Sequence, residues 1–267
     1  MDEMRARFRS LHDAGMFLMP NPWDAGSARI LEELGFPALA TTSSGLAAAL
    51  GKADQQVTLD ELAAHVRALT TVIAVPLNVD AERCYDDIAE TVEALAAAGA
   101  SGISIEDYDP ATGQVETLET GAARVAVAKE ACARYGVVLT ARAENLLYGH
   151  DDLDDTIARL RAYRAAGADV AYAPGLITPQ DITRVVAGVP APINVLALAG
   201  TPETAELAEL GVRRVSTGGS LAWAAYGALR NAARELLDTG TTTFRAASLA
   251  GDEIAAIAAR GSAAGGR

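Results

Sequence analysis

The chain has 267 residues, half of them hydrophobic, and a formal net charge of −13. An acidic chain lacks the basic surface that a nucleic acid or an anionic membrane requires, so neither is expected as a partner. No apolar run approaches the roughly 20 residues of a membrane span, and the N-terminal stretch MDEMRARFRS has no apolar signal core, which predicts a cytoplasmic protein with reduced thiols at Cys84 and Cys132.

Short apolar segments alternate with longer, alanine-rich segments of helical periodicity. The expected β-strands are residues 16–19, 38–42, 72–79, 102–105, 137–141, 170–173, 193–196 and 214–217. Amphipathic helices are expected at residues 24–35, 86–100, 156–169 and 201–212. Asp24 or Ser27 is the expected N-cap of the first, and each of the four ends at a glycine shortly before a strand, which is typical of repeating β/α units.

Eight strands separated by helices predict a single (β/α)8 TIM barrel within residues 1–260. An open doubly wound sheet usually has fewer strands, and the glycine motif of a dinucleotide-binding fold does not follow the first strand. Residues 252–260 are expected to form a late additional helix, and the tail 261–267 is expected to be disordered.

Polar residues stand at the ends of several predicted strands, where a parallel barrel carries its functional groups. Asp80 and Glu82 follow the third strand, Glu106 the fourth and Arg142 the fifth, and Asn194 belongs to the seventh. Carboxylate oxygens suit Mg²⁺ or Mn²⁺. An arginine opposite them can bind a carboxylate or phosphonate through two parallel hydrogen bonds. These residues predict a site for a divalent cation and a small anionic substrate.

The same residues have simpler interpretations. Asp80 could cap a helix, and Glu106 could only pair with Arg142. Trp23 could be an ordinary core residue. Cys84 is expected to be buried and inert, because free cysteines usually are and nothing in the sequence indicates a lowered pKa.

Four segments, NPWDAGSARILEELGFPALATTSSGLAAALGKAD, NVDAE, GISIED and TARAE, resemble the isocitrate lyase/phosphoenolpyruvate mutase superfamily in their order and spacing. The resemblance runs from about residue 19 to residue 229 and is greatest to the small phosphonomutase-like proteins. It implies a barrel whose eighth helix is exchanged between the subunits of a homodimer or homotetramer. It also implies Mg²⁺-dependent chemistry on 2-oxo acids through an enolate.

The resemblance assigns metal-binding roles to four acids. Asp80 matches the direct Mg²⁺ ligand, and Glu82 takes the second acidic position of that motif. Glu106 and Asp54 match acids that hold the metal through water.

The resemblance also assigns residues to the substrate. The family's backbone cradle for the substrate carboxylate corresponds to Ser44, Gly45 and Leu46, and residues that line the substrate correspond to Trp23 and Arg142. Arg142 and Glu106 are therefore the expected catalytic residues, with Asn194 as a further substrate contact.

Two segments depart from the family pattern. The glycine-containing turn after the acidic pair is replaced by Arg83-Cys84-Tyr85-Asp86, which could fill part of the pocket or add a carboxylate contact. The loop whose cysteine acts as acid/base in the carbon–carbon lyases is replaced by YDPATGQVETLE, which contains neither cysteine nor histidine. Cleavage of isocitrate or methylisocitrate by the usual mechanism is therefore not expected.

The leading hypothesis is an Mg²⁺-dependent lyase that acts on a small 2-oxo or 2-hydroxy carboxylic acid, by carbon–carbon cleavage or decarboxylation through a pyruvate-type enolate. One alternative is chemistry at a phosphorus–carbon bond, as in phosphonopyruvate hydrolase or phosphoenolpyruvate mutase. Another is a barrel that binds a 2-oxo acid without turnover.

Overall fold

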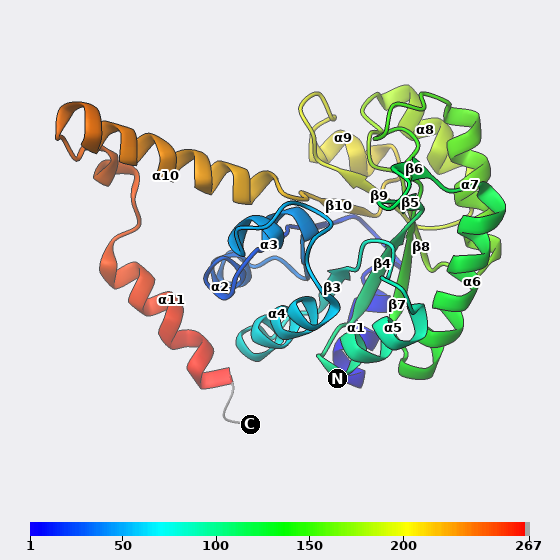
Figure 1. Ribbon diagram of the computed structural model, residues 1–267, viewed down its shortest axis with the longest axis horizontal. Helices are drawn as coiled ribbons and strands as arrows, with labels where there is room; N and C mark the ends of the chain where they lie inside the picture. Colours follow the sequence, from blue (N-terminus) through cyan, green and yellow to red (C-terminus); the bar gives the residue numbers. More distant parts are fainter. Residues whose placement is uncertain (265–267) are drawn as a thin grey trace.

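The computed structural model describes residues 1–264, and these form a (β/α)8 barrel (Figure 1). The sheet has eight strands in the order β1-β10-β9-β8-β7-β4-β3-β2, all paired in parallel. The Ala40 N–H donates to the Pro20 carbonyl at 3.1 Å between the two strands at the ends of this order, so the barrel is nearly closed. The predicted fold class is confirmed.

The eight barrel strands lie close to the predicted segments. They are β1 Phe17–Met19, β2 Leu39–Ala40, β3 Leu77–Asp80, β4 Gly102–Glu106, β7 Val138–Arg142, β8 Val170–Tyr172, β9 Ile193–Leu196 and β10 Arg214–Ser216. A separate antiparallel hairpin is formed by β5 Tyr108–Asp109 and β6 Gln114–Val115.

Helices surround the barrel, except that α10 and α11 extend away from it (Figure 1). They are α1 Asp2–Ser10, α2 Ala25–Glu33, α3 Ser43–Ala49, α4 Leu59–Val72, α5 Ile88–Ala97, α6 Leu118–Tyr135, α7 Leu153–Ala165, α8 Pro179–Gly188, α9 Thr204–Glu209, α10 Ser220–Thr239 and α11 Gly251–Ala264, with a 3-10 turn η1 at Thr243–Ala247. Within the described residues, no helix is both long and apolar enough to cross a membrane.

Reciprocal capping boxes fix the start of two helices. The Ser27 N–H donates to Asp24 Oδ1 at 2.7 Å, and the Asp24 N–H donates to Ser27 Oγ at 3.1 Å. The two residues expected as alternative caps of α2 therefore act together. Thr58 and Glu61 form the same arrangement at the start of α4.

The third strand corrects the sequence prediction. Residues 72–79 were expected to form it, but Val72 ends α4 and residues 73–76 connect that helix to β3. A continuous apolar run shows neither the helical nor the alternating strand periodicity. The end of α4 and the start of β3 are therefore mistaken for one long strand in the sequence. Residues 261–264 of the expected disordered tail belong to α11, and residues 265–267 lie outside the described residues.

Helix α1, which was not predicted, closes the amino end of the barrel. Its Phe8 is fully buried in a cluster with Phe17 and Met19. Its Arg5 is also buried and donates from Nη2 to the Ala96 carbonyl at 2.7 Å and from Nη1 to the Tyr135 carbonyl at 2.8 Å. These bonds satisfy carbonyls at the ends of α5 and α6 and fix α1 in place.

Helix α10 is the helix that follows the eighth barrel strand, and it extends away from the barrel (Figure 1). Of its 20 residues, only Ala222 is buried. Helix α11 returns to contact α2. A helix with an apolar side exposed along most of its length is typical of an interaction surface.

Candidate active site

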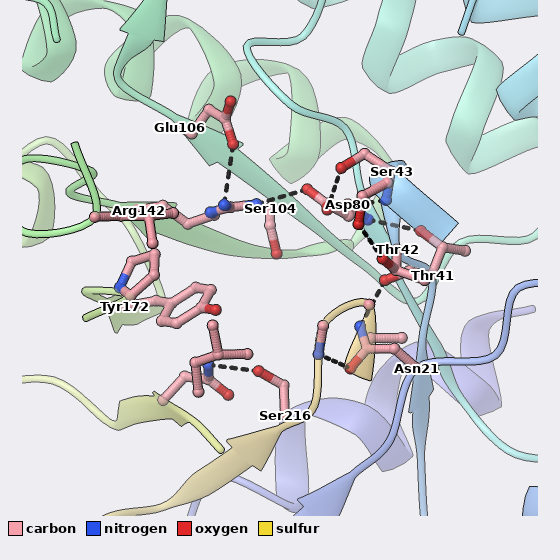
Figure 2. A pocket seen from close by; sticks show the side chains of 18 of the residues that line it. Asn21, Thr41, Thr42, Ser43, Asp80, Ser104, Glu106, Arg142, Tyr172 and Ser216 are labelled. Atoms are coloured by element: carbon pink, nitrogen blue, oxygen red, sulfur yellow. Dashed lines mark hydrogen bonds and ion pairs between the residues drawn. The ribbon is translucent and has the colours of Figure 1, made fainter. Parts of the chain in front are cut away.

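A cavity of about 180 Å³ opens at the carboxyl ends of the barrel strands (Figure 2). The predicted site residues that border it are Ser44, Asp54, Asp80, Glu106, Arg142 and Asn194. The predicted site residues that do not border it are Trp23, Gly45, Leu46 and Glu82. Leu46 is buried in the hydrophobic core, and Trp23 lies beside Tyr226 of α10, with ring centroids 6.4 Å apart.

Arg142, the last residue of β7, is held by three carboxylates. Its Nη1 lies 2.7 Å from Asp80 Oδ1 and its Nη2 lies 3.1 Å from Glu106 Oε2 (Figure 2). Its Nε lies 2.8 Å from Glu144 Oε1. The ring of Tyr172 lies 5.3 Å from the guanidinium carbon. Burial lowers the pKa of Arg142, but the three carboxylates outweigh this effect and raise the pKa well above its usual value. A fixed positive charge therefore faces the cavity.

Asp80 is held from both sides at the end of β3. Its Oδ2 accepts from the Ser43 N–H at 3.2 Å and from Ser43 Oγ at 3.0 Å, and its own N–H donates to Thr41 Oγ1 at 2.9 Å. Since Thr41 follows β2 and Ser43 begins α3, this carboxylate ties two adjacent β/α units together at the mouth of the barrel (Figure 2).

The backbone expected to cradle a substrate carboxylate is the start of α3. Thr42 caps this helix, because its Oγ1 accepts from the Gly45 N–H at 3.3 Å and its carbonyl accepts from the Leu46 N–H at 3.0 Å. The Ser44 N–H has no acceptor among the described residues. Of the three expected amides, Ser44 is therefore the one with an N–H available to a ligand.

The acids at the mouth raise one another's pKa. Burial, followed by the charges of Asp80 and Asp54, raises the pKa of Glu82 to about 8. Burial also raises the pKa of Glu106 well above its usual value, against the opposing effect of Arg142. Glu82 Oε1 is buried without a hydrogen-bond partner in the described structure. A raised pKa favours the protonated acid, so burial and mutual repulsion hold Glu82 and Glu106 toward their neutral forms, and a bound cation would favour their ionised forms.

The four acids predicted to bind metal do not form one cluster. Among residues 1–264, no group of three or more His, Cys, Asp or Glu side chains is arranged to hold a metal ion. Arg142 instead bridges Asp80 and Glu106, so the ion pair considered as the simpler interpretation of Glu106 is present. Mg²⁺ usually takes one or two carboxylates and keeps several waters, so it needs no such cluster.

The turn after Asp80 is strained. Glu82, Cys84 and Tyr85 have φ of 50°, 60° and 50°, in the left-handed region that favours glycine. Arg83 donates from Nε to Glu116 Oε1 at 2.9 Å and so points to the β5–β6 hairpin, and it does not border the cavity. Burial raises the pKa of the Cys84 thiol, which is fully enclosed, so its expected inertness agrees with the structure.

Asp107, next to Glu106, plays a supporting part. Its Oδ2 accepts from Tyr163 Oη at 2.6 Å and from Arg159 Nη1 at 3.0 Å. Its Oδ1 accepts from the Glu144 N–H at 2.8 Å. Asp107 thereby fixes the backbone of Glu144, and Glu144 in turn binds Arg142.

Several residues of the cavity were missed in the sequence. Asn78, Ser104 and Thr140 lie two residues before Asp80, Glu106 and Arg142, and side chains two apart on a strand share a face. The first two border the cavity. The spacing of two residues from a predicted site residue could therefore have identified Asn78 and Ser104 from the sequence.

Tyr148 had no comparable signal. It borders the cavity from the loop after β7, and its ring stacks on Tyr108 of the hairpin, with centroids 3.8 Å apart and planes 7° apart.

Comparisons with known proteins agree with this geometry. The phosphoenolpyruvate phosphomutase family matches residues 8–237. An oxaloacetate decarboxylase of Bradyrhizobium sp. (strain ORS 278) is 34% identical over 200 residues, which are 71% of this chain and 67% of that protein.

Solved structures show the same fold. A provisionally named lyase/mutase of Burkholderia cenocepacia J2315 superposes with a TM-score of 0.91 and 44% identity, over 95% of each chain. A 2,3-dimethylmalate lyase superposes with a TM-score of 0.84 and 25% identity, over 96% of this chain and 94% of the other.

Proposed function

Because the chain belongs to the phosphoenolpyruvate phosphomutase family, we propose that it is a carbon–carbon lyase acting on a small 2-oxo or 2-hydroxy carboxylic acid. The observation that carries this proposal is the fixed guanidinium of Arg142, which faces a small cavity among more carboxylates than it neutralises. The related oxaloacetate decarboxylase and dimethylmalate lyase support the substrate class.

Members of the superfamily generally depend on a divalent metal ion, and the residues here fit one. The donors are oxygens only, one buried oxygen of Glu82 has no partner, and the acids raise one another's pKa. We assign Mg²⁺, with Asp80 as its direct ligand and Glu106, Glu82 and Asp54 in supporting positions. When bound, Mg²⁺ would act as a Lewis acid that stabilises negative charge on the substrate oxygen.

The chain's own residues hold and orient the substrate. Arg142 uses one N–H from each nitrogen on the three acids, so one N–H on each terminal nitrogen remains for a substrate carboxylate. Ser44, whose N–H is free among the described residues, borders the same cavity. Fixed donors of this kind keep the bond to be broken in one orientation, which lowers the entropic part of the barrier.

Decarboxylation of a 2-oxo acid leaves an electron pair on the carbon next to the 2-oxo group, and a proton must be added there later. Cleavage of a 2-hydroxy acid also requires a base that takes the hydroxyl proton, and Glu106, which borders the cavity, is the acid that we assign to this step. The described residues that border the cavity include neither a cysteine nor a histidine. The phenols of Tyr148 and Tyr172 border the cavity and are the remaining candidates for the proton donor. A decarboxylation needs no base at all, since CO₂ departs and only the later protonation requires a donor.

Thermal unfolding with Mg²⁺ and oxalate tests this proposal, with oxalate as the analogue of a pyruvate enolate. Mg²⁺ and oxalate together should raise the midpoint of the wild-type protein, since a ligand that binds only the native state stabilises it. Asp80→Ala should abolish the shift. Asp13→Ala, which removes an exposed charge near the amino end of the barrel, should preserve it. Absence of a shift in the wild type would overturn the proposal.

A turnover panel separates the two kinds of chemistry. Oxaloacetate, 2,3-dimethylmalate and phosphonopyruvate should be offered with Mg²⁺, and pyruvate or another 2-oxo product measured. Turnover of phosphonopyruvate alone would replace the carbon–carbon reading with phosphorus–carbon chemistry. Binding of oxalate without turnover of any compound would favour a binding protein.

We further propose that the protein is a homodimer or homotetramer assembled through α10. Trp223, Leu229 and Leu237 on this helix are 50%, 65% and 85% exposed, and a second copy could cover them. Light scattering after size exclusion should give a mass at least twice that of one chain. Leu229→Arg should reduce it, while Asn231→Arg, at an exposed polar position of the same helix, should not. A wild-type monomer would contradict the assembly.

A further inference from the structure

Arg214 is a buried cation inside the barrel, below the acids of the mouth. It is the largest fully buried side chain, with 1% of its surface exposed. It is the first residue of β10 and pairs in register with Phe17 of β1 and Asn194 of β9. It borders the same cavity as Arg142. The cavity therefore carries one guanidinium at its mouth and another at its floor.

Every partner of Arg214 is neutral. Its Nε donates to Asn194 Oδ1 at 2.8 Å, its Nη2 donates to Thr140 Oγ1 at 3.0 Å, and its Nη1 lies 3.4 Å from His12 Nε2. The His12 Nδ1 lies 2.9 Å from the Phe8 carbonyl and must donate to it, so Nε2 is the acceptor for Arg214. Within residues 1–264, no carboxylate forms an ion pair with Arg214.

These contacts leave the guanidinium incompletely used. It has five N–H donors, and three have acceptors among the described residues. The two that remain belong to the terminal nitrogens, which are the pair that a carboxylate binds bidentately. A buried charge without a counter-charge is unfavourable, so an anion in the cavity would gain both hydrogen bonds and charge compensation.

We propose that Arg214 is the binding site for a second carboxylate of the substrate, which makes the substrate a dicarboxylic 2-oxo or 2-hydroxy acid. This inference rests on the proposed function, because Arg142 and the start of α3 are taken to hold the first carboxylate. Asn194 then acts as a positioning residue, since its Oδ1 binds Arg214 and its Nδ2 donates to Ser216 Oγ at 3.0 Å.

Malate and lactate provide a matched pair of probes, because both are small 2-hydroxy acids and malate carries one more carboxylate. Their dissociation constants should be measured by calorimetry with saturating Mg²⁺, using both enantiomers. The wild-type protein should bind malate roughly 10- to 100-fold more tightly than lactate, the range expected for hydrogen bonds between charged groups. Arg214→Met should reduce this preference at least tenfold and leave the affinity for oxalate unchanged.

Two variants serve as controls. Arg213→Met removes the same charge from the neighbouring position, where Nη1 donates to the Gly15 carbonyl outside the cavity, and it should keep the preference for malate. Arg214→Lys keeps the charge with a different donor geometry and should retain part of the preference.

The outcomes separate this inference from the proposed function. Equal affinities for malate and lactate in the wild type would overturn it, even if Arg214→Met does not fold. An equal loss of malate, lactate and oxalate binding in Arg214→Met would also overturn it, because the residue would then act on the whole site. Failure of oxalate to bind the wild type would instead refute the proposed function.

Discussion

His12 gives the most direct test of the charge arrangement below the cavity. Burial, followed by the charge of Arg214, lowers its pKa from 6.5 to about 3. Below pH 6.5 the unfolded chain binds a proton on this ring and the folded chain does not. The free energy of unfolding therefore decreases as the pH is lowered below 6.5. At about 1.36 kcal/mol per pH unit, a change from pH 6.5 to pH 5.0 should remove about 2 kcal/mol.

Urea denaturation followed by circular dichroism at both pH values measures this contribution. His12→Asn removes the titrating ring, so the stability difference between wild type and variant should shrink by about 2 kcal/mol at the lower pH. The lost packing against Phe8 and Phe17 does not depend on pH and cancels in this comparison. His65, whose pKa burial lowers to about 4, contributes equally to both proteins.

The control is His150→Asn, which replaces an exposed histidine and should keep the pH dependence of the wild type. A His12→Asn protein that also keeps that dependence would refute the reasoning. His12 would then accept a proton in the folded state, and it could not be the neutral acceptor that Arg214 requires.

Two further substitutions test the packing around the mouth. Gly45→Ala would place a Cβ 2.5 Å from Thr42 Cγ2, so urea denaturation should show a loss of about 1–3 kcal/mol in the free energy of unfolding. Gly26→Ala, whose Cβ would lie 3.5 Å from its nearest neighbour, should change it by less than about 1 kcal/mol, and equal losses would contradict the argument. Arg83→Ala removes the ion pair with Glu116 and should lower stability by about 1 kcal/mol while it speeds cleavage at the hairpin tip by a nonspecific protease. Unchanged cleavage would show that this pair does not hold the hairpin.

The strand pattern of the barrel could be predicted because parallel strands are short, apolar and followed by polar ends. The errors fell where two elements meet without a turn residue between them. Val72 ends α4, yet the β-branched residues that follow it suggested a longer strand. The capping box of Thr58 and Glu61 marks the start of that helix, and it was the available sign that residues 59–72 are helical.

The mouth of the site could be predicted for the same reason that the strands could. Asp80, Glu106 and Arg142 are the last residues of strands that are neighbours in the sheet, so their convergence follows from topology. The position of Arg214 at the floor of the cavity could not be predicted from the sequence. Arg213 and Arg214 are adjacent, and a shift of one residue in the register of β10 would decide which of them enters the barrel. Only the three-dimensional pairing settles that choice.

The ion pair between the turn after β3 and the β5–β6 hairpin ties together the two segments that depart from the family pattern. Glu116 is mostly buried and binds Arg83 of the turn, while Arg124 lies 3.6 Å from its other oxygen. A relative that regained a glycine at position 83 would leave part of that buried carboxylate without compensation. The conformations of the turn and of the hairpin loop therefore depend on each other through this ion pair. Grafting a cysteine-bearing loop onto this barrel would require exchanging the turn in the same step.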